Sequence, residues 1–157
     1  MKKLTLESYK EIDVDEFVTN LREADKLEAH AMGYDSLKEA IETSLDCAYI
    51  SFVAKGENGE TLCIFGLSSL THSEYGRAVW FLGTNEMDNY SREFVHYSKI
   101  IIGEMLKEHD RLYNYISVEN DKSIRWLKRL GASFSEPFTL NGEKFLLFIL
   151  GGDELCV

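Results

Sequence analysis

The chain has 157 residues, and its charged side chains give a formal net charge of −10. Hydrophobic residues make up 45% of the sequence and aromatic residues 12%, which supplies a packed core and excludes a disordered, low-complexity protein. Non-specific nucleic-acid binding needs a basic surface, so we expect no direct contact with nucleic acid. We expect a single domain over residues 1–157, because a chain of this length is the usual size of one domain.

Membrane-bound and metal-centred classes are also excluded. No apolar run approaches the roughly 20 residues of a membrane-spanning helix, and the N-terminus turns polar too early for a signal peptide. Three cysteines, Cys47, Cys63 and Cys156, are widely spaced and form no Cys-x-x-Cys pair, and the four histidines are scattered. We therefore expect neither disulfides nor a metal site, and a reducing cytoplasm as the location.

Mostly helical structure is predicted for the first third of the chain. A short strand over residues 3–9 precedes an apolar stripe that starts after Asp13, which can cap a helix together with Glu16. Two further helical segments follow, one ending at Gly33 and one starting after Ser36. The sequence thus predicts one strand and three short helices.

Three strands are predicted in the middle of the chain. Residues 47–55 and 61–70 are rich in aromatic and β-branched side chains, and Asn58-Gly59 lies between them. Asn-Gly between two such segments is the strongest short-range signal for a hairpin. A third strand is predicted over residues 77–84.

The C-terminal half alternates helices and strands. A long helix with an apolar stripe is predicted over residues 90–109, then a strand over 112–118 and a helix over 122–130. Two final strands, 132–140 and 143–150, are joined by Asn141-Gly142. The order β-ααα-β-β-β-α-β-α-β-β predicts an α+β fold built around one sheet.

Helical spacing predicts one buried side for the helix over 122–130. Ile124, Leu127 and Leu130 lie on this side, and Trp126 lies on its flank. The residues expected to face outward are Arg125, Lys128 and Arg129. Asn120 or Asp121 caps the helix, and Gly131 ends it.

The stretch from Val118 to Gly131 resembles a motif of GNAT N-acetyltransferases, in which a strand ends in Val-x-Asn and the next helix closes in Leu-Gly-Phe. Here Asn120 and Gly131 stand at the usual separation. The element order extends the likeness over residues 46–150. The resemblance implies a GNAT-like fold with a mixed central sheet flanked by helices, in which the strands before and after the long helix are parallel and splay apart.

A second resemblance is to a family of tailed-phage proteins that includes an internal virion or assembly protein of short-tailed phages. The matching residues are Val79 to Phe81, Leu112 to Val118, Ser123 to Lys128, Leu130 to Ala132, and Leu21, Arg22, Asp25 and Glu28. This resemblance implies a phage or host protein as partner. It also implies a location in the cytoplasm of the host bacterium or in the virion.

The GNAT resemblance also implies an acetyl-CoA site, from which this sequence departs twice. In GNAT enzymes the pyrophosphate lies on a glycine-rich loop before the long helix, but residues 85–91 contain no glycine and include Glu86 and Asp88. The tyrosine that protonates the leaving thiolate in many GNAT enzymes corresponds to Leu127, which has no proton to give. If acetyl-CoA binds, the implied contacts are Leu82, Thr84, Ser91, Arg92 and Asn120.

The sequence selects no catalytic residue. Candidates by residue type are Glu28, Glu74 and His72 for a general base, and Tyr90, Tyr113 and Tyr115 for a proton donor. Asp25 lies three residues from Glu28 on a predicted helix, so the two share a face. They are either paired carboxylates with acid–base duty or part of a solvated acidic face, and we favour the solvated face.

Three functions remain open. The first is a phage-derived GNAT-fold module for assembly or partner binding, with a degenerate acetyl-CoA site. The alternative is an active N-acetyltransferase that transfers acetyl from acetyl-CoA to an amine. The third is a phage inhibitor of a host protein, for which an acidic surface is suitable.

Overall fold

The computed structural model of the chain describes residues 1–8 and 12–152. The first third contains β1 (Thr5–Ser8), α1 (Val14–Thr19), α2 (Glu23–Ala31) and α3 (Leu37–Asp46). The middle contains β2 (Ala48–Lys55), β3 (Thr61–His72), β4 (Gly76–Gly83), the 3-10 helix η1 (Asn85–Tyr90) and α4 (Ser91–Glu108). The last third contains β5 (Leu112–Ser117), α5 (Asp121–Arg129), β6 (Ser133–Phe134), β7 (Phe138–Leu140) and β8 (Glu143–Leu150).

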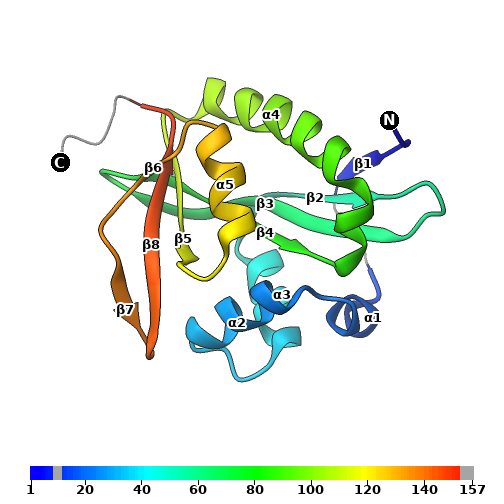
Figure 1. Cartoon of the computed structure of the whole chain (residues 1–157), viewed down its shortest axis with the longest axis horizontal. Coiled ribbons are helices and arrows are strands. Elements are labelled where there is room, and N and C mark those ends of the chain that lie inside the picture. The colour runs from blue at the N-terminus through cyan, green and yellow to red at the C-terminus, as the bar shows by residue number, and fades with distance from the viewer. Residues whose placement is uncertain (9–11, 153–157) are drawn as a thin grey trace.

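All eight strands join one sheet in the order β1-β2-β3-β4-β5-β8-β6, and β7 also pairs with β8. Figure 1 shows α4 and α5 on one side of this sheet and α1, α2 and α3 on the other. Apolar side chains fill both sides: Met105 and Leu127 belong to the core under α4 and α5, and Phe17 and Ile41 to the core under α1 and α3. The predicted α+β fold with a mixed central sheet is confirmed.

The parallel pairing of β4 and β5 is short. Arg77 pairs with Leu112 and Ala78 with Tyr113, and the register continues no further. The crossover between these strands is α4, as a parallel pair requires. Beyond Ala78 the two strands separate, which confirms the splay implied by the GNAT resemblance. The remaining strand pairs in the described ranges are antiparallel.

Several local predictions are confirmed by hydrogen bonds and backbone angles. The Asp13 carboxylate accepts from the Glu16 N–H at 3.0 Å and so caps α1. At the tip of the β7–β8 hairpin, Asn141 has a φ of 47° and Gly142 a φ of 83°. Two consecutive positive φ angles are the signature of the type I′ turn that Asn-Gly favours. These features form from neighbouring residues alone, which is why the sequence predicts them.

Two predicted boundaries are wrong. The predicted strand 132–140 is two short strands, β6 and β7, because Pro137 lies between them and has no N–H for the ladder. The predicted loop 85–91 is helical over η1 and leads directly into α4. Tyr9, the predicted end of the first strand, and Cys156 lie outside the described residues.

The predicted burial of α5 is confirmed on both faces. Leu127 is buried with 2% of its surface exposed, and Trp126 and Leu130 are half-buried on the same core. Arg125 and Lys128 are exposed, as is Arg129. The Trp126 indole N–H donates to the Ser98 hydroxyl of α4 at 2.9 Å, so the flank of α5 is tied to the neighbouring helix. Within the part of the chain that the structure describes, no helix is long and apolar enough to cross a membrane.

Replacing Leu127 by Ala should lower the free energy of unfolding by about 2–5 kcal/mol, because it removes a buried side chain and leaves a cavity. The neighbouring Lys128→Ala, on the exposed face, should change it by no more than about 0.5 kcal/mol. Urea denaturation followed by circular dichroism measures both values. Equal losses in the two variants would show that the helix is rotated from the orientation described.

Candidate functional site

A cleft with a volume of about 740 Å³ lies where β4 and β5 separate. Its walls come from both sides of the sheet: Ile102 of α4 and Leu127 of α5 line one end, and Ala29 of α2 and Ala40 of α3 line the other. The cleft therefore runs through the splay between the two strands. Of the cofactor residues implied by the sequence, Leu82 and Asn120 line it.

The edge of β4 that faces the splay is largely occupied by groups of the chain itself. The Gly83 N–H donates to Asp25 Oδ2 at 2.9 Å, and the Gly83 carbonyl accepts from the Arg22 N–H at 3.0 Å. The Val79 carbonyl accepts from the Asn114 side-chain amide at 2.6 Å. β4 pairs with β3 on one side, and the N–H and C=O groups of every second residue of β4 face away from β3. Between Val79 and Gly83, the residue whose N–H and C=O face the cleft is therefore Phe81.

Asp25 and Arg22 form a clasp between the start of α2 and the end of β4. The Arg22 guanidinium donates to both carboxylate oxygens of Asp25, at 2.9 and 3.0 Å, and stacks over the Phe81 ring at 5.1 Å. Asp25 is 3% exposed. Our interpretation of Asp25 and Glu28 as a solvated acidic face is therefore wrong for Asp25, whose charge is buried and neutralised by a bidentate pair.

Glu28 lies one helical turn further along α2 and lines the cleft. Its Oε1 atom accepts from the Ser117 N–H and from the Asn120 side-chain amide, each at 3.1 Å. Burial raises the pKa of Glu28 to about 7, the nearby Asp25 charge adds to this rise, and the two hydrogen bonds and Arg22 oppose it. A carboxyl group with a pKa near neutrality can act as a general base, so Glu28 is the sequence candidate best positioned for proton transfer.

Asn120 has two structural roles. Its Oδ1 accepts from the Ser123 N–H at 3.3 Å and caps α5, while its amide donates to Glu28. The residue is 8% exposed. Both ends of the side chain are thus engaged within the protein, and Asn120 serves to fix the carboxylate of Glu28 between α2 and α5.

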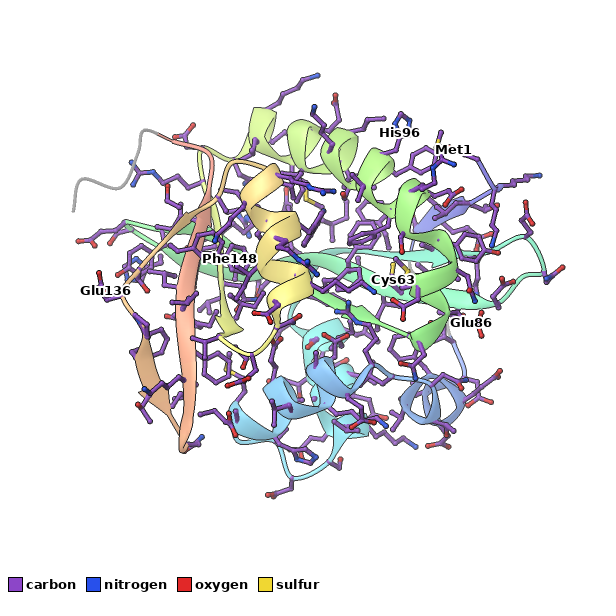
Figure 2. All side chains as sticks on the ribbon, in the orientation of Figure 1. Met1, Cys63, Glu86, His96, Glu136 and Phe148 are labelled. Atoms are coloured by element: carbon purple, nitrogen blue, oxygen red, sulfur yellow. The ribbon has the colours of Figure 1, made fainter. Side chains whose placement is uncertain are left out.

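Acidic groups surround the start of α4, where the GNAT resemblance implies the pyrophosphate. Glu86 accepts from Asn89 at 3.1 Å and lies at the outer edge of the molecule, as Figure 2 shows. Asp88 pairs with Lys122 of α5, so its charge is partly neutralised. Glu86 therefore supplies the uncompensated negative charge of η1, and the first turn of α4 adds one base, Arg92, and one acid, Glu93.

That first turn contains a buried acid. Glu93 is 4% exposed, and its carboxylate accepts from the Lys2 N–H at 2.6 Å. This hydrogen bond holds the pKa of Glu93 below its ordinary value, so the group is ionised at neutral pH. Lys2 also donates through Nζ to the Asn89 carbonyl at 2.9 Å. The N-terminal segment of the chain therefore lies against the start of α4.

The other residues implied for the cofactor are spread out. Thr84 is 2% exposed and donates to the Leu62 carbonyl at 2.9 Å. Ser91 and Arg92 are exposed at the start of α4, and the Ser91 hydroxyl donates to the Asp88 carbonyl at 3.0 Å. None of these three residues lines the cleft.

The remaining catalytic candidates fall into two groups. Tyr113 and Tyr115 line the cleft together with Glu28, and burial, with a smaller effect of the neighbouring Tyr115, raises the pKa of Tyr113. His72 is the exposed last residue of β3, next to the β3–β4 turn; it stacks on Tyr75 at 4.1 Å and is not part of the cleft wall. Glu74 lies in the β3–β4 turn itself. The structure thus brings together Glu28 and the two tyrosines and separates them from the turn.

Tyr90, the last of the catalytic candidates, is engaged elsewhere. The Tyr90 hydroxyl donates to Glu60 at 2.8 Å and accepts from the Glu57 N–H at 3.0 Å, which ties it to the β2–β3 turn.

Cys63 points inward beneath α4 in Figure 2, and burial raises the pKa of its thiol to about 12. Among the described residues, no group of three or more acidic, histidine or cysteine side chains is arranged to hold a metal ion.

Sequence reasoning missed Ser117, Asn114 and the role of Asp25. Ser117 acts through its backbone N–H, so its side chain carries no signal. Asn114 lies inside a β-rich segment, where a polar amide between Tyr113 and Tyr115 was a visible irregularity. The Asp25 contact to Gly83 joins residues 58 positions apart and has no local signature.

Glu28→Gln should stabilise the protein at pH 8 by about 1–3 kcal/mol, since it removes a carboxylate whose ionised form is disfavoured by burial. The folded-state pKa of about 7 lies above the ordinary value of 4.5, so the folded protein binds the extra proton between these values. Wild-type stability therefore falls as pH rises from about 4.5 to 7. The gain in the variant should be absent below pH 4.5, grow over this interval and stay constant above it.

Glu23→Gln is the matched control, because Glu23 is an exposed acid on the same helix. Its effect should stay within about 0.5 kcal/mol and change little with pH. Urea denaturation at pH 4.5, 6 and 8 measures both series. A loss of stability in Glu28→Gln at pH 8, or a difference independent of pH, would contradict the assigned environment of Glu28.

Solved structures with similar folds are N-acetyltransferases. The chain superposes on the ribosomal-protein-S18-alanine N-acetyltransferase of Escherichia coli with a TM-score of 0.66 and 11% identity, covering 99% of each chain. Spermidine N-acetyltransferase of Vibrio cholerae, solved with CoA and spermine, gives a TM-score of 0.61 and 16% identity, covering 94% of each chain. A Bacillus subtilis acetyltransferase solved with CoA gives 0.63 and 14%, covering 96% of this chain and all (100%) of the other. Likeness at these identities shows the GNAT fold.

The sequence itself matches phage proteins. The family model described as "Bacteriophage T7, probable scaffold protein Gp13" matches residues 61–139, from the start of β3 into β7. The probable scaffold protein gp13 of Escherichia phage T7 is 32% identical over 94 residues, which cover 57% of this chain and 67% of that protein. The chain has the GNAT fold, and it belongs to the family of the phage T7 probable scaffold protein Gp13.

Proposed function

We propose that this chain is a phage assembly protein that uses the GNAT fold as one partner-binding domain over residues 1–157, with a degenerate acetyl-CoA site. Its partner is a phage protein, and its place of action is the cytoplasm of the host bacterium or the assembling virion. The observation that carries the proposal is the start of α4, where an anionic cofactor would have to bind.

Anion binding at a helix start needs free N–H groups and a favourable local charge. Here the segment that leads into α4 is η1, which lacks glycine. Glu86 of η1 and Glu93 of α4 add negative charge where an anion would need positive charge. The contact between Glu93 and the Lys2 N–H further fills this end of the helix. Arg92, Lys122 and Lys2 supply positive charge nearby, but Lys122 is already paired with Asp88, and the Lys2 ammonium donates to the Asn89 carbonyl.

The clasp on β4 supports the same proposal. An extended ligand that adds to a strand edge needs a run of free N–H and C=O groups. The Gly83 N–H and C=O are already hydrogen-bonded to Asp25 and Arg22, and the Val79 carbonyl is hydrogen-bonded to the Asn114 side chain. Phe81 alone offers both groups between these contacts, which leaves too short an edge for the repeated hydrogen bonds of an added strand.

One observation favours the alternative, an active N-acetyltransferase. Glu28 combines a cleft position with a pKa of about 7, as a general base requires. In that case acetyl-CoA is the cofactor, and its contacts are those that the resemblance implies: Leu82, Thr84, Ser91, Arg92 and Asn120. Tyr113 or Tyr115 would then supply the proton to the thiolate.

Isothermal titration with acetyl-CoA separates the two functions. We expect no measurable heat of binding, because the negative charge of Glu86 and Glu93 repels the pyrophosphate. A known GNAT acetyltransferase titrated under the same conditions is the positive control. Micromolar affinity for acetyl-CoA would overturn the proposal and make the enzyme the better assignment.

Partner binding through the cleft can be tested in the phage. Met32 lines the cleft and is 37% exposed, so Met32→Lys should alter the docking surface without disturbing the core. We expect this variant to fail to complement a phage that lacks the gene. Ile100→Lys on the outer face of α4, where Ile100 is 52% exposed, is the matched control and should complement fully. Equal complementation by both variants would exclude the cleft as the docking surface.

A further inference from the structure

Glu28 presents an unused oxygen atom to the cleft. Both of its hydrogen bonds, from Ser117 and Asn120, end on Oε1. No donor within residues 1–8 and 12–152 contacts Oε2. An ionised carboxylate has about four acceptor positions. The arrangement therefore holds one oxygen rigidly and leaves the other available to a ligand.

The charge within the cleft is negative. The charged side chains in its lining are Arg22, Asp25 and Glu28. Arg22 and Asp25 neutralise each other through two hydrogen bonds, so the carboxylate of Glu28 is the uncompensated charge. Glu28 is half-buried, and a largely desolvated carboxylate without its own counter-ion is costly to hold, so a ligand that brings a positive charge reduces this cost.

The walls around Glu28 suit a cation carried on an apolar stem. Tyr113, Tyr115, Trp80 and Phe81 line the same cleft. Aromatic faces attract cations, and apolar walls pack well against the methylene groups of long basic side chains. A small anion would be repelled by the carboxylate, and a neutral donor could bond to it but would leave its charge uncompensated.

The surface formed by the helices next to the cleft is also negatively charged. Residues 13–46, which form α1, α2 and α3, contain ten acidic and three basic residues. In Figure 1 these helices lie together on one side of the sheet. Such a surface attracts a basic partner over a longer range than a single ion pair does.

We propose that the cleft binds a lysine or arginine side chain of the partner protein, with its charged group on Glu28 Oε2 and its stem against the aromatic walls. This inference rests on the proposed partner-binding function and names the chemistry that the partner brings. The side chain is bound without covalent change. It takes the place of the counter-ion that Glu28 lacks.

The test uses the full-length, ¹⁵N-labelled protein at pH 8 and low salt, with Nα-acetyl-lysine methylamide as the probe. The matched control ligand is the norleucine derivative, which keeps the methylene stem and lacks the ammonium group. We expect saturable shifts of the Ser117 N–H and Asn120 amide signals with lysine, with a Kd on the order of millimolar, and no saturation with norleucine. Equal binding of the two probes, or no saturable shift with lysine, would overturn the inference.

Two further measurements assign the cation to Glu28. Glu28→Gln should weaken lysine binding at least tenfold, whereas Glu23→Gln should leave it unchanged. Lowering the pH from 8 to 6 should weaken binding by about tenfold, because a carboxyl with a pKa of about 7 loses most of its charge over this range. The charged groups that act on Glu28 are Asp25 and Arg22, which form an ion pair with each other. Undiminished binding to Glu28→Gln would contradict the assignment.

These outcomes are distinct from those that test the proposed function. If Met32→Lys abolishes complementation and the lysine probe does not bind, partner docking stands and the cationic side chain is excluded. If acetyl-CoA binds with micromolar affinity, the proposed function fails, whatever the lysine result. The comparison of lysine with norleucine uses wild-type protein, so it remains decisive even if a Glu28 variant does not fold.

Discussion

Parallel pairing between β4 and β5 stops after two residue pairs, and the rest of the site depends on how the chain satisfies the backbone groups that this leaves unpaired. Buried N–H and C=O groups without partners are costly, so each needs a substitute for the missing strand. The Asn114 side chain donates a hydrogen bond to the Val79 carbonyl. The Asp25 carboxylate accepts from the Gly83 N–H, and the Glu28 carboxylate accepts from the Ser117 N–H. Three polar side chains thus replace part of a ladder, and the cleft is what remains between them.

Two of these side chains, Asp25 and Glu28, are acids, so they bring negative charge into the region between the strands. The surroundings of the two carboxylates differ. Asp25 meets a guanidinium and becomes part of the framework. Glu28 meets neutral donors from Ser117 and Asn120, so burial raises its pKa to about 7. A glutamine at position 28 could accept the same two hydrogen bonds without that cost. Residues that cost stability are typical of functional sites, and this contrast is the reason for assigning function to Glu28.

Features that depend on neighbouring residues were predictable from the sequence. The Asp13 cap, the Asn141-Gly142 turn and the buried side of α5 around Leu127 follow from local spacing, and the order of elements indicated the GNAT fold. The contacts that build the site were not predictable, because their partners are distant along the chain and residues such as Ser117 act through the backbone. The break at Pro137 had a visible signal, since proline cannot donate to a ladder.

The length of chain between the bonded groups determines when the cleft forms. Glu28 joins partners 89 and 92 residues away, and Asn141 at the tip of the last hairpin donates to the Ala31 carbonyl across 110 residues. Closing such loops costs entropy that is recovered only once the intervening elements are in place. On the ribosome α2 is synthesised well before β5, α5 and β8, so its contacts through Glu28 and the Ala31 carbonyl must wait for most of the chain, although the Asp25 contact to Gly83 can form earlier. The cleft is therefore a late product of folding, and a partner that recognises it selects completed molecules over partly folded ones.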